Sequence, residues 1–420
     1  MELLALVEEG LDLLRSLAHA RGSSAGRRIC AMIGSPRKEL DVIAERAEAG
    51  GSPAQPVQAK LGEQGRDAPD RDHGDRPGAG LSMTNHDPSA CSPIGVTSDA
   101  LASIILVVGA PRSGTTWLAK IIDSHPDVLY RHEPDEILPG PPSLISAGLP
   151  GLLADWVADR SARSVTKRPF FPKSWQPAWA RWLRSLLAGA LGAASRLPAP
   201  LNRLERVPIP DLMGRPAPRV AIKSVRWADG AAVLARTLPA SRTIFILRHP
   251  CGQIASVMRG TRQWRFDLKT EGTDMPFDES AALSFAAAHG ANDAIFQMLP
   301  DAAKYAWSWR AFNEPAYAAL AAQPNVHVVL YEALCARPQA QARRILTFAG
   351  LDWNAQTEDF VVRSSEHQGS AGYYTIFRDA VAAAEAWRKT MPPADQDAVR
   401  SVVAASPLAR FWPDLISASG

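Results

Sequence analysis

Cysteine and long apolar runs are scarce in this chain. Its 420 residues include only four cysteines, and no two of them form a C-x-x-C pair. A disulfide framework and a zinc site are therefore not expected, and a reducing, cytoplasmic location fits best. No apolar run is long enough to cross a bilayer, so we expect no integral membrane segment. The net charge is only +3, and the Lys and Arg residues are scattered, which argues against a nucleic-acid partner.

Large apolar side chains are also scarce near the N-terminus. Residues from about 22 to 100 are rich in Gly, Pro, Asp and Arg and cannot bury enough surface to offset the entropy of ordering. We therefore predict a mostly disordered extension over residues 1–100 and one folded domain over residues 101–416. Met83 lies just before the ordered part, and we hypothesise that translation starts there. Detection of residues 1–82 in the native protein by mass spectrometry would exclude this.

Short apolar runs, each followed by a helical pattern, predict the architecture of the folded domain. The runs lie near residues 104–108, 220–222, 243–247 and 326–331, and a further apolar patch, VLY, stands at residues 128–130. Strands that alternate with helices predict an α/β fold with a P-loop-type central parallel sheet and helices on both faces. Two helical or irregular insertions, near residues 138–218 and 261–322, are expected to form the walls of a substrate site.

The segment VVGAPRSGTTWLAK has the glycine spacing of a phosphate-binding loop but lacks its lysine. Gly109 and Gly114 form G-x-x-x-x-G, and Thr115 and Thr116 stand where a nucleoside triphosphatase has Lys and then Ser or Thr. The backbone N–H groups of residues 113–116 and the N-terminus of the following helix are expected to bind a phosphate. No Asp follows the run at residues 243–247 to hold Mg²⁺, so we expect no metal and no nucleotide hydrolysis.

Positive residues follow three of the predicted strands. Arg112, Lys223 and Arg248 each stand just beyond an apolar run. Ligands of open parallel sheets bind outside the carboxyl ends of the strands. The three cations therefore predict an anion site there, with one phosphate at the loop and a second anion near Arg248.

These motifs resemble a known family. GAPRSGTTWLAKIIDSHP resembles the 5′-phosphosulfate loop of sulfotransferases that use 3′-phosphoadenosine 5′-phosphosulfate (PAPS), and ILRHPCGQIASVMRG resembles their 3′-phosphate motif. The stretches VAIKSVRWADGAAVLARTLPASRTIFILRHP, VLYEALCARPQAQARRILTFAGL and YYTIFRDAVAAAEAWR look like the carbohydrate sulfotransferase branch. The resemblance covers roughly residues 104–412. It implies the sulfotransferase fold, PAPS as donor without a metal, and a hydroxyl-bearing small molecule or glycan, such as a carbohydrate or glycolipid, as acceptor.

The resemblance also implies roles for individual residues. Arg112 would stabilise charge on the bridging oxygen as sulfate leaves. Trp117 would stack on the adenine, with packing in the core as the alternative reading. Arg248 and Ser256 would hold the 3′-phosphate, and Arg378 would close over the cofactor. The full set of expected cofactor contacts is Arg112, Ser113, Gly114, Thr115, Thr116, Trp117, Arg248, Ser256 and Arg378.

Transfer to a hydroxyl requires a base, and two neighbouring residues are candidates. Glu133 resembles the Glu-Pro glutamate of the carbohydrate branch and is our first choice. His132 is the second, although we expect its side chain to point to the opposite face of the strand. A salt bridge from Glu133 to Arg131 or another Arg is the structural alternative. Lys223 is expected near the transferring group or the acceptor.

Two other functions remain open from the sequence. The first is a P-loop kinase or nucleoside triphosphatase, which the missing lysine disfavours. The second is a non-catalytic protein that binds 3′-phosphoadenosine 5′-phosphate (PAP), which Glu133 and Lys223 disfavour. The sequence leaves the identity of the acceptor and the oligomeric state open.

Overall fold

A computed structural model describes residues 96–138, 148–194, 208–262, 278–366, 377 and 379–416. All of them belong to one compact unit, Met83–Gly420. The expected disorder of residues 1–95 therefore concerns a part of the chain outside the described residues. Residues 96–100, which we assigned to the extension, belong to the fold: Val96 is buried and pairs with Ala217, and helix α4 covers Ser98–Ala102.

The centre of the fold is a sheet of five parallel strands in the order β2-β3-β1-β4-β5. The strands are β1 (Ile105–Val108), β2 (Val128–His132), β3 (Arg219–Ser224), β4 (Arg242–Leu247) and β5 (Val326–Leu330). Each apolar run and the VLY patch form one strand, which confirms the predicted α/β class. The inner strands are continuous apolar runs because helices cover both faces of the sheet.

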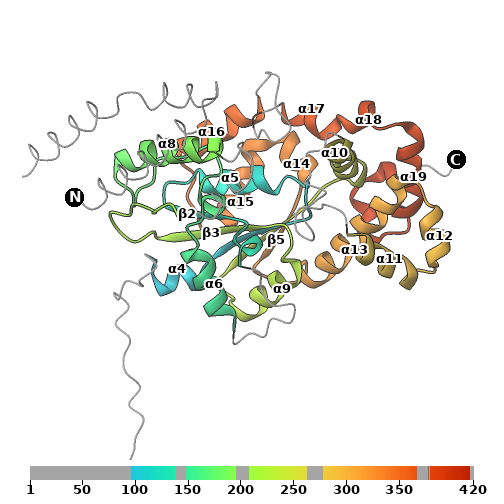
Figure 1. The fold of residues 1–420 in the computed structure, drawn as a ribbon, viewed down its shortest axis with the longest axis horizontal. Coiled ribbons are helices and arrows are strands. Elements are labelled where there is room, and N and C mark those ends of the chain that lie inside the picture. The colour runs from blue at the N-terminus through green and yellow to red at the C-terminus, as the bar shows by residue number, and fades with distance from the viewer. Residues whose placement is uncertain are drawn as a thin grey trace, which may run out of the picture. The chain divides into compact units, whose positions relative to one another are not determined.

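Alternate residues of β1 enter two different cores. Leu106 and Val108 pack in one apolar cluster with Trp227 and Trp309. Ile105 and Val107 pack in a second cluster that includes side chains of the helix after β1. Figure 1 shows the same arrangement: α5, α15 and α16 lie on one side of the sheet, and α6 and α9 lie on the other.

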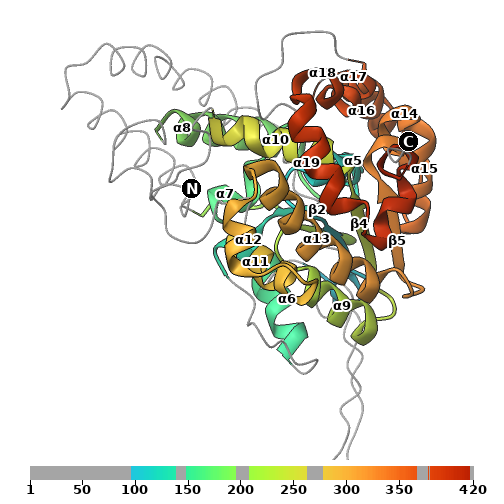
Figure 2. The same ribbon diagram turned by 90° about the vertical axis from the view of Figure 1, so that its right-hand side faces the viewer.

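Helices connect the strands and occur in the described parts of both insertions. Among the described residues, the first insertion contains three α-helices and the second contains three more, as expected for helical insertions, and α11, α12, α13 and α19 lie together in Figure 2. None of the helices within the described ranges is long and apolar enough to cross a membrane. The helices are α5 (Thr115–Asp123), η1 (Pro134–Glu136), α6 (Leu149–Ala158), α7 (Ala162–Val165), α8 (Ala178–Ala194), α9 (Ala228–Thr237), α10 (Pro250–Arg262), α11 (Glu279–Ala288), α12 (Asp293–Met298), α13 (Asp301–Leu320), α14 (Tyr331–Ala336), α15 (Pro338–Phe348), α16 (Ala355–Ser365), α17 (Ala380–Glu385), α18 (Trp387–Thr390), α19 (Pro393–Val403), η4 (Pro407–Phe411) and η5 (Pro413–Leu415).

Candidate functional site

The glycine-rich segment forms a tight loop between β1 and α5. Arg112 and Gly114 both have positive φ, 67° and 101°. A Cβ atom at Gly114 would lie 2.5 Å from the ring of Tyr331, so only glycine fits there. No side chain caps the first turn of α5, which leaves its N-terminus open to an anion. The N–H of Ser113, however, donates to the carbonyl oxygen of Ala110 (3.1 Å), so it is used within the loop.

Three residues predicted to hold the cofactor meet beside this loop. The Nε of Arg112 donates a hydrogen bond to the Oγ of Ser256 on α10 (3.2 Å). The Nη1 of Arg248, which follows β4, donates to the carbonyl oxygen of Arg112 (3.0 Å). The guanidinium of Arg248 also lies over the ring of Tyr331, 4.4 Å from its centroid. The loop, the end of β4 and α10 therefore form one cationic group.

Glu133 and Lys223 form an ion pair at the same edge of the sheet. Lys223 lies inside β3, not beyond it as predicted, and it is in register with His132 on β2. Its Nζ contacts the Oε1 of Glu133, and the N–H of Glu133 donates to the carbonyl oxygen of Lys223 (2.8 Å). Arg131 is not the partner of Glu133, because it binds Asp211 through both carboxylate oxygens (2.9 and 2.7 Å).

His132 and Glu133 do not point to opposite faces, so our expectation for this pair is wrong. The Nε2 of His132 lies 3.7 Å from the Oε2 of Glu133. The reason is local: Glu133 adopts a left-handed conformation (φ 50°, ψ 50°) directly after β2. The alternation of side chains that holds within a strand therefore stops at His132.

Burial and neighbouring cations set the protonation of this group. Burial lowers the pKa of Lys223 to about 7, and the nearby Arg112 guanidinium acts in the same direction. The carboxylate of Glu133 opposes this effect by favouring the charged ammonium. Burial, followed by the charges of Lys223 and Lys167, holds the pKa of His132 well below its usual value, so its imidazole is neutral at neutral pH.

Thr115, Thr116 and Trp117, at the end of the loop and the start of α5, differ in how exposed they are. Thr116 is partly exposed, whereas Thr115 is buried. Trp117 is also buried: its indole N–H donates to the Oγ of Ser364 (2.9 Å), and its ring meets that of Tyr331 edge to face. These contacts match the core-packing alternative and leave little of the ring for an adenine to stack on.

Arg378 lies outside the described residues, so its predicted role has no structural account. Trp309 and Arg310, which the second insertion contributes, are buried in protein contacts. The indole of Trp309 donates to the carbonyl oxygen of Arg248 (3.3 Å), and Arg310 pairs with Glu314. Both side chains therefore contribute to the fold around the site.

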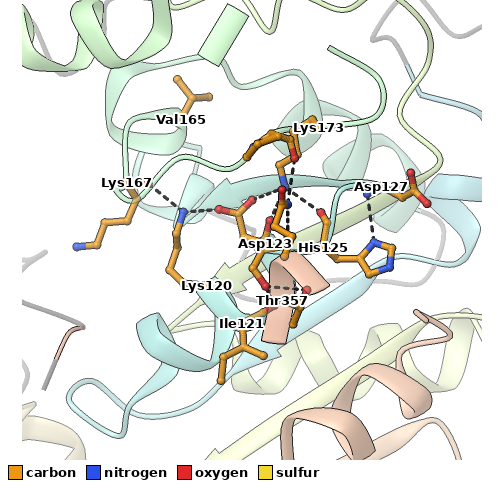
Figure 3. A network of polar contacts seen from close by, with 12 residues as sticks. Lys120, Ile121, Asp123, His125, Asp127, Val165, Lys167, Lys173 and Thr357 are labelled. Atoms are coloured by element: carbon orange, nitrogen blue, oxygen red, sulfur yellow. Dashed lines mark hydrogen bonds and ion pairs between the residues drawn. The ribbon is translucent and has the colours of Figure 1, made fainter. Parts of the chain in front are cut away.

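Sequence reasoning missed a group of buried charges next to the site. Lys120 on α5 and Lys173 in the first insertion converge on the carboxylate of Asp123, as Figure 3 shows. Burial lowers the pKa of Lys120 to about 8. With Lys167 and Tyr130, these side chains line a small cavity. Lys120 and Asp123 belong to the amphipathic pattern of α5, and no motif surrounds the other lysines, so only tertiary structure reveals the group.

No group of His, Cys, Asp and Glu side chains in the described ranges is arranged to hold a metal ion. The polar groups at this edge of the sheet are instead cations, hydroxyls and backbone N–H groups, which suit phosphate and sulfate oxygens. They lie near the carboxylate of Glu133 and the neutral imidazole of His132. Together these groups suit a site that binds an anion beside a proton acceptor.

Comparison with known proteins identifies the family. A family model described as "Sulfotransferase family" matches residues 104–355, more than half of the 420 residues. The chain therefore belongs to the sulfotransferase family, a class of transferases that move a sulfuryl group. The matched model names no branch of the family. A search of curated proteins gave no match.

Several solved structures are similar to this chain. A sulfotransferase domain from the curacin biosynthetic pathway is 16% identical, covering 72% of this chain and 97% of that domain, with a TM-score of 0.35. A mouse sulfotransferase complexed with PAP is 15% identical, covering 74% and 89%, with a TM-score of 0.34. A sulfotransferase from Alicyclobacillus acidocaldarius is 17% identical, covering 70% and 98%, with a TM-score of 0.28. The family assignment rests on the family model and not on these TM-scores.

Proposed function

We propose that this protein transfers the sulfuryl group of PAPS to the hydroxyl of an acceptor. One observation carries the proposal: the Arg112–Ser256 and Arg248–Arg112 hydrogen bonds gather three predicted cofactor residues at one edge of the sheet. The Glu133–Lys223 ion pair stands at that same edge. A donor with two anionic groups and a nearby base are what sulfuryl transfer to a hydroxyl requires.

Two buried polar atoms support this choice of donor. The Oγ of Ser113 and the Nε of Arg248 have no hydrogen-bond partner within the described part of the chain. Buried polar groups in folded proteins are rarely left without a partner. A phosphate oxygen accepts hydrogen bonds from both a hydroxyl and a guanidinium. The loop would thus hold the 5′-phosphosulfate, and Arg248 with Ser256 would hold the 3′-phosphate.

The residues of the site supply the rest of the chemistry. When bound, PAPS supplies an activated sulfuryl group. The guanidinium of Arg112 stabilises negative charge that develops beside the loop. Glu133 accepts the proton of the acceptor hydroxyl, and Lys223 holds this carboxylate in place through its ammonium. Because the pKa of Lys223 is lowered to about 7, its ammonium can also release or regain a proton near neutral pH.

The acceptor class and the location are proposed from the sequence. Resemblance to the carbohydrate branch favours a carbohydrate or glycolipid hydroxyl. The scarcity of cysteine favours a reducing, cytoplasmic compartment. Residues 101–416 are proposed as the catalytic domain.

Calorimetric titration tests the donor. Wild type, Arg248→Ala and Arg343→Ala would each be titrated with PAP and with Mg-ATP. Arg343 is about half exposed and controls for the loss of a positive charge. We expect PAP to bind wild type and Arg343→Ala alike, and Arg248→Ala at least tenfold more weakly with an unchanged circular dichroism spectrum. Equal or tighter binding of Mg-ATP would instead favour a kinase. PAP binding without transfer of label from PAPS to any hydroxyl acceptor would favour a non-catalytic protein.

A further inference from the structure

Tyr130 and His132 form a buried hydrogen-bonded pair on β2. The hydroxyl of Tyr130 lies 2.8 Å from the Nδ1 of His132, and both residues are 7% exposed. They are two positions apart on one strand, so both side chains point to the same face of the sheet. Burial raises the pKa of Tyr130 well above its usual value, so the phenol keeps its proton.

This contact determines which ring nitrogen of His132 carries the hydrogen. Within the described part of the chain, the Nδ1 of His132 is the one hydrogen-bond partner of the Tyr130 hydroxyl. A buried hydroxyl donates where it finds an acceptor, so its hydrogen points at Nδ1. The imidazole is neutral, because burial, and after it the charges of Lys223, Lys167, Lys120 and Arg163, hold its pKa well below the usual value. The ring hydrogen therefore lies on Nε2.

The Nε2–H of His132 faces the carboxylate of Glu133. The separation of 3.7 Å between Nε2 and Oε2 is too long for a hydrogen bond, although a small rotation of either side chain would close it. In this tautomer neither ring nitrogen can accept a proton from an acceptor hydroxyl: Nδ1 is occupied by Tyr130 and Nε2 already carries a hydrogen. Of the two neighbouring candidates, only Glu133 can serve as the base.

We propose that Tyr130 is a positioning residue that holds His132 in the Nε2–H tautomer and thereby leaves the base role to Glu133. The second half of this proposal rests on the proposed sulfuryl transfer; the first half does not. In this role Tyr130 acts through its hydrogen bond to His132. The ring of Tyr130 is itself held in place by Lys120, whose Nζ lies 5.2 Å from the ring centroid.

Nitrogen NMR tests the tautomer in the protein without ligand. The ¹⁵N shifts of the His132 ring, assigned with His132→Asn, distinguish a protonated from an unprotonated nitrogen. We expect a protonated Nε2 and an unprotonated Nδ1 in wild type. Tyr130→Phe keeps the ring but removes the hydroxyl, and we expect it to give a mixture of both tautomers. A protonated Nδ1 in wild type, or an unchanged spectrum in Tyr130→Phe, would overturn the proposal.

Kinetics with labelled PAPS and the best hydroxyl acceptor from a screen test the base. General-base catalysis contributes about 10²–10⁴-fold to rate, so Glu133→Gln should lose about that much kcat. His132→Asn and Tyr130→Phe should lose about tenfold or less, with an unchanged KM for PAPS. A larger loss in His132→Asn than in Glu133→Gln would show that His132 is the base. Failure of all sulfuryl transfer would sink the proposed function, while the NMR result would still decide the tautomer.

Discussion

The Nε of Arg112 donates a hydrogen bond to the Oγ of Ser256 at 3.2 Å, although 144 positions separate the two residues in the sequence. One belongs to the glycine-rich loop after β1 and the other to α10 after β4. These strands are neighbours in the sheet, so their carboxyl ends bring the loop and α10 together. The contact links the two halves of the predicted donor site.

Ser256→Ala should weaken PAP binding and little else. Hydrogen bonds to charged groups contribute about 1.5–3 kcal/mol, so the Kd for PAP should rise roughly ten- to a hundredfold. Calorimetric titration measures this change. Ser401→Ala, at an exposed position on α19, is the matched control and should bind PAP as wild type does. Similar affinities for the two variants would remove Ser256 from the site.

Gly114→Ala should disrupt the loop while the rest of the domain stays folded. The change places a side chain at φ 101° and within 2.5 Å of the Tyr331 ring, so the loop must shift. Strain of this kind costs about 1–3 kcal/mol, and we expect PAP binding to be lost. Gly151→Ala, on α6, is the control because its Cβ would meet no atom within 4 Å. Thermal unfolding and PAP titration would be measured for both; wild-type affinity in Gly114→Ala would contradict the proposed role of the loop.

Lys223 should make the protein more stable as pH rises above neutrality. Its pKa falls from 10.5 to about 7 on folding, so between these values the unfolded chain binds a proton that the folded chain has released. The free energy of unfolding then increases with pH across this window, by at most about 1.4 kcal/mol per pH unit. Urea unfolding at a series of pH values from about 7 to about 9 measures the slope.

Lys223→Met should reduce this slope, because the titrating group is removed. Lys389→Met removes an exposed ammonium and controls for the change in net charge. The Glu133 carboxylate favours charged Lys223, so the observed slope should lie below the upper limit. An identical pH dependence in wild type and Lys223→Met would show that the burial of Lys223 has no such effect.

The sheet and its carboxyl edge could be predicted because each depends on local patterns. Strands buried on both faces give short continuous apolar runs, and residues that follow such runs reach the same edge of a parallel sheet. Arg112 and Arg248 were placed there by this reasoning, and the structure brings them together. The predicted position of Lys223 beyond the strand is off by only a residue or two, because β3 continues through Lys223.

The contacts around Glu133 could not be predicted, because they depend on one backbone conformation and on distant partners. Strand alternation predicts opposite directions for His132 and Glu133, and the left-handed turn at Glu133 reverses that result. Tyr130 lies in an apolar patch and gives no sign that its hydroxyl faces an imidazole. Lys173 approaches Asp123 from an insertion that carries no motif.

Asp123→Asn should strongly destabilise the fold at neutral pH. Asp123 pairs with both Lys120 and Lys173, which are almost completely buried, and its charge favours the charged form of each. Removal of one partner from a buried ion pair costs about 3–5 kcal/mol, because an uncompensated charge stays in the interior. Urea unfolding at neutral pH would measure the loss. Asp359→Asn, whose carboxylate is more than half exposed, is the control and should change stability by about 0.5 kcal/mol or less.

The loss in Asp123→Asn should shrink as pH rises. The pKa of Lys120 is already lowered to about 8 with Asp123 present, and it must fall further once the carboxylate is gone. As pH rises toward this value, Lys120 can release its proton in the folded variant, and the cost of burying its charge falls. The difference in free energy of unfolding between wild type and Asp123→Asn should therefore be larger at neutral pH than in mild alkali. A difference that is equal at the two pH values would mean that Asp123 stabilises the fold through its hydrogen bonds and not through its charge.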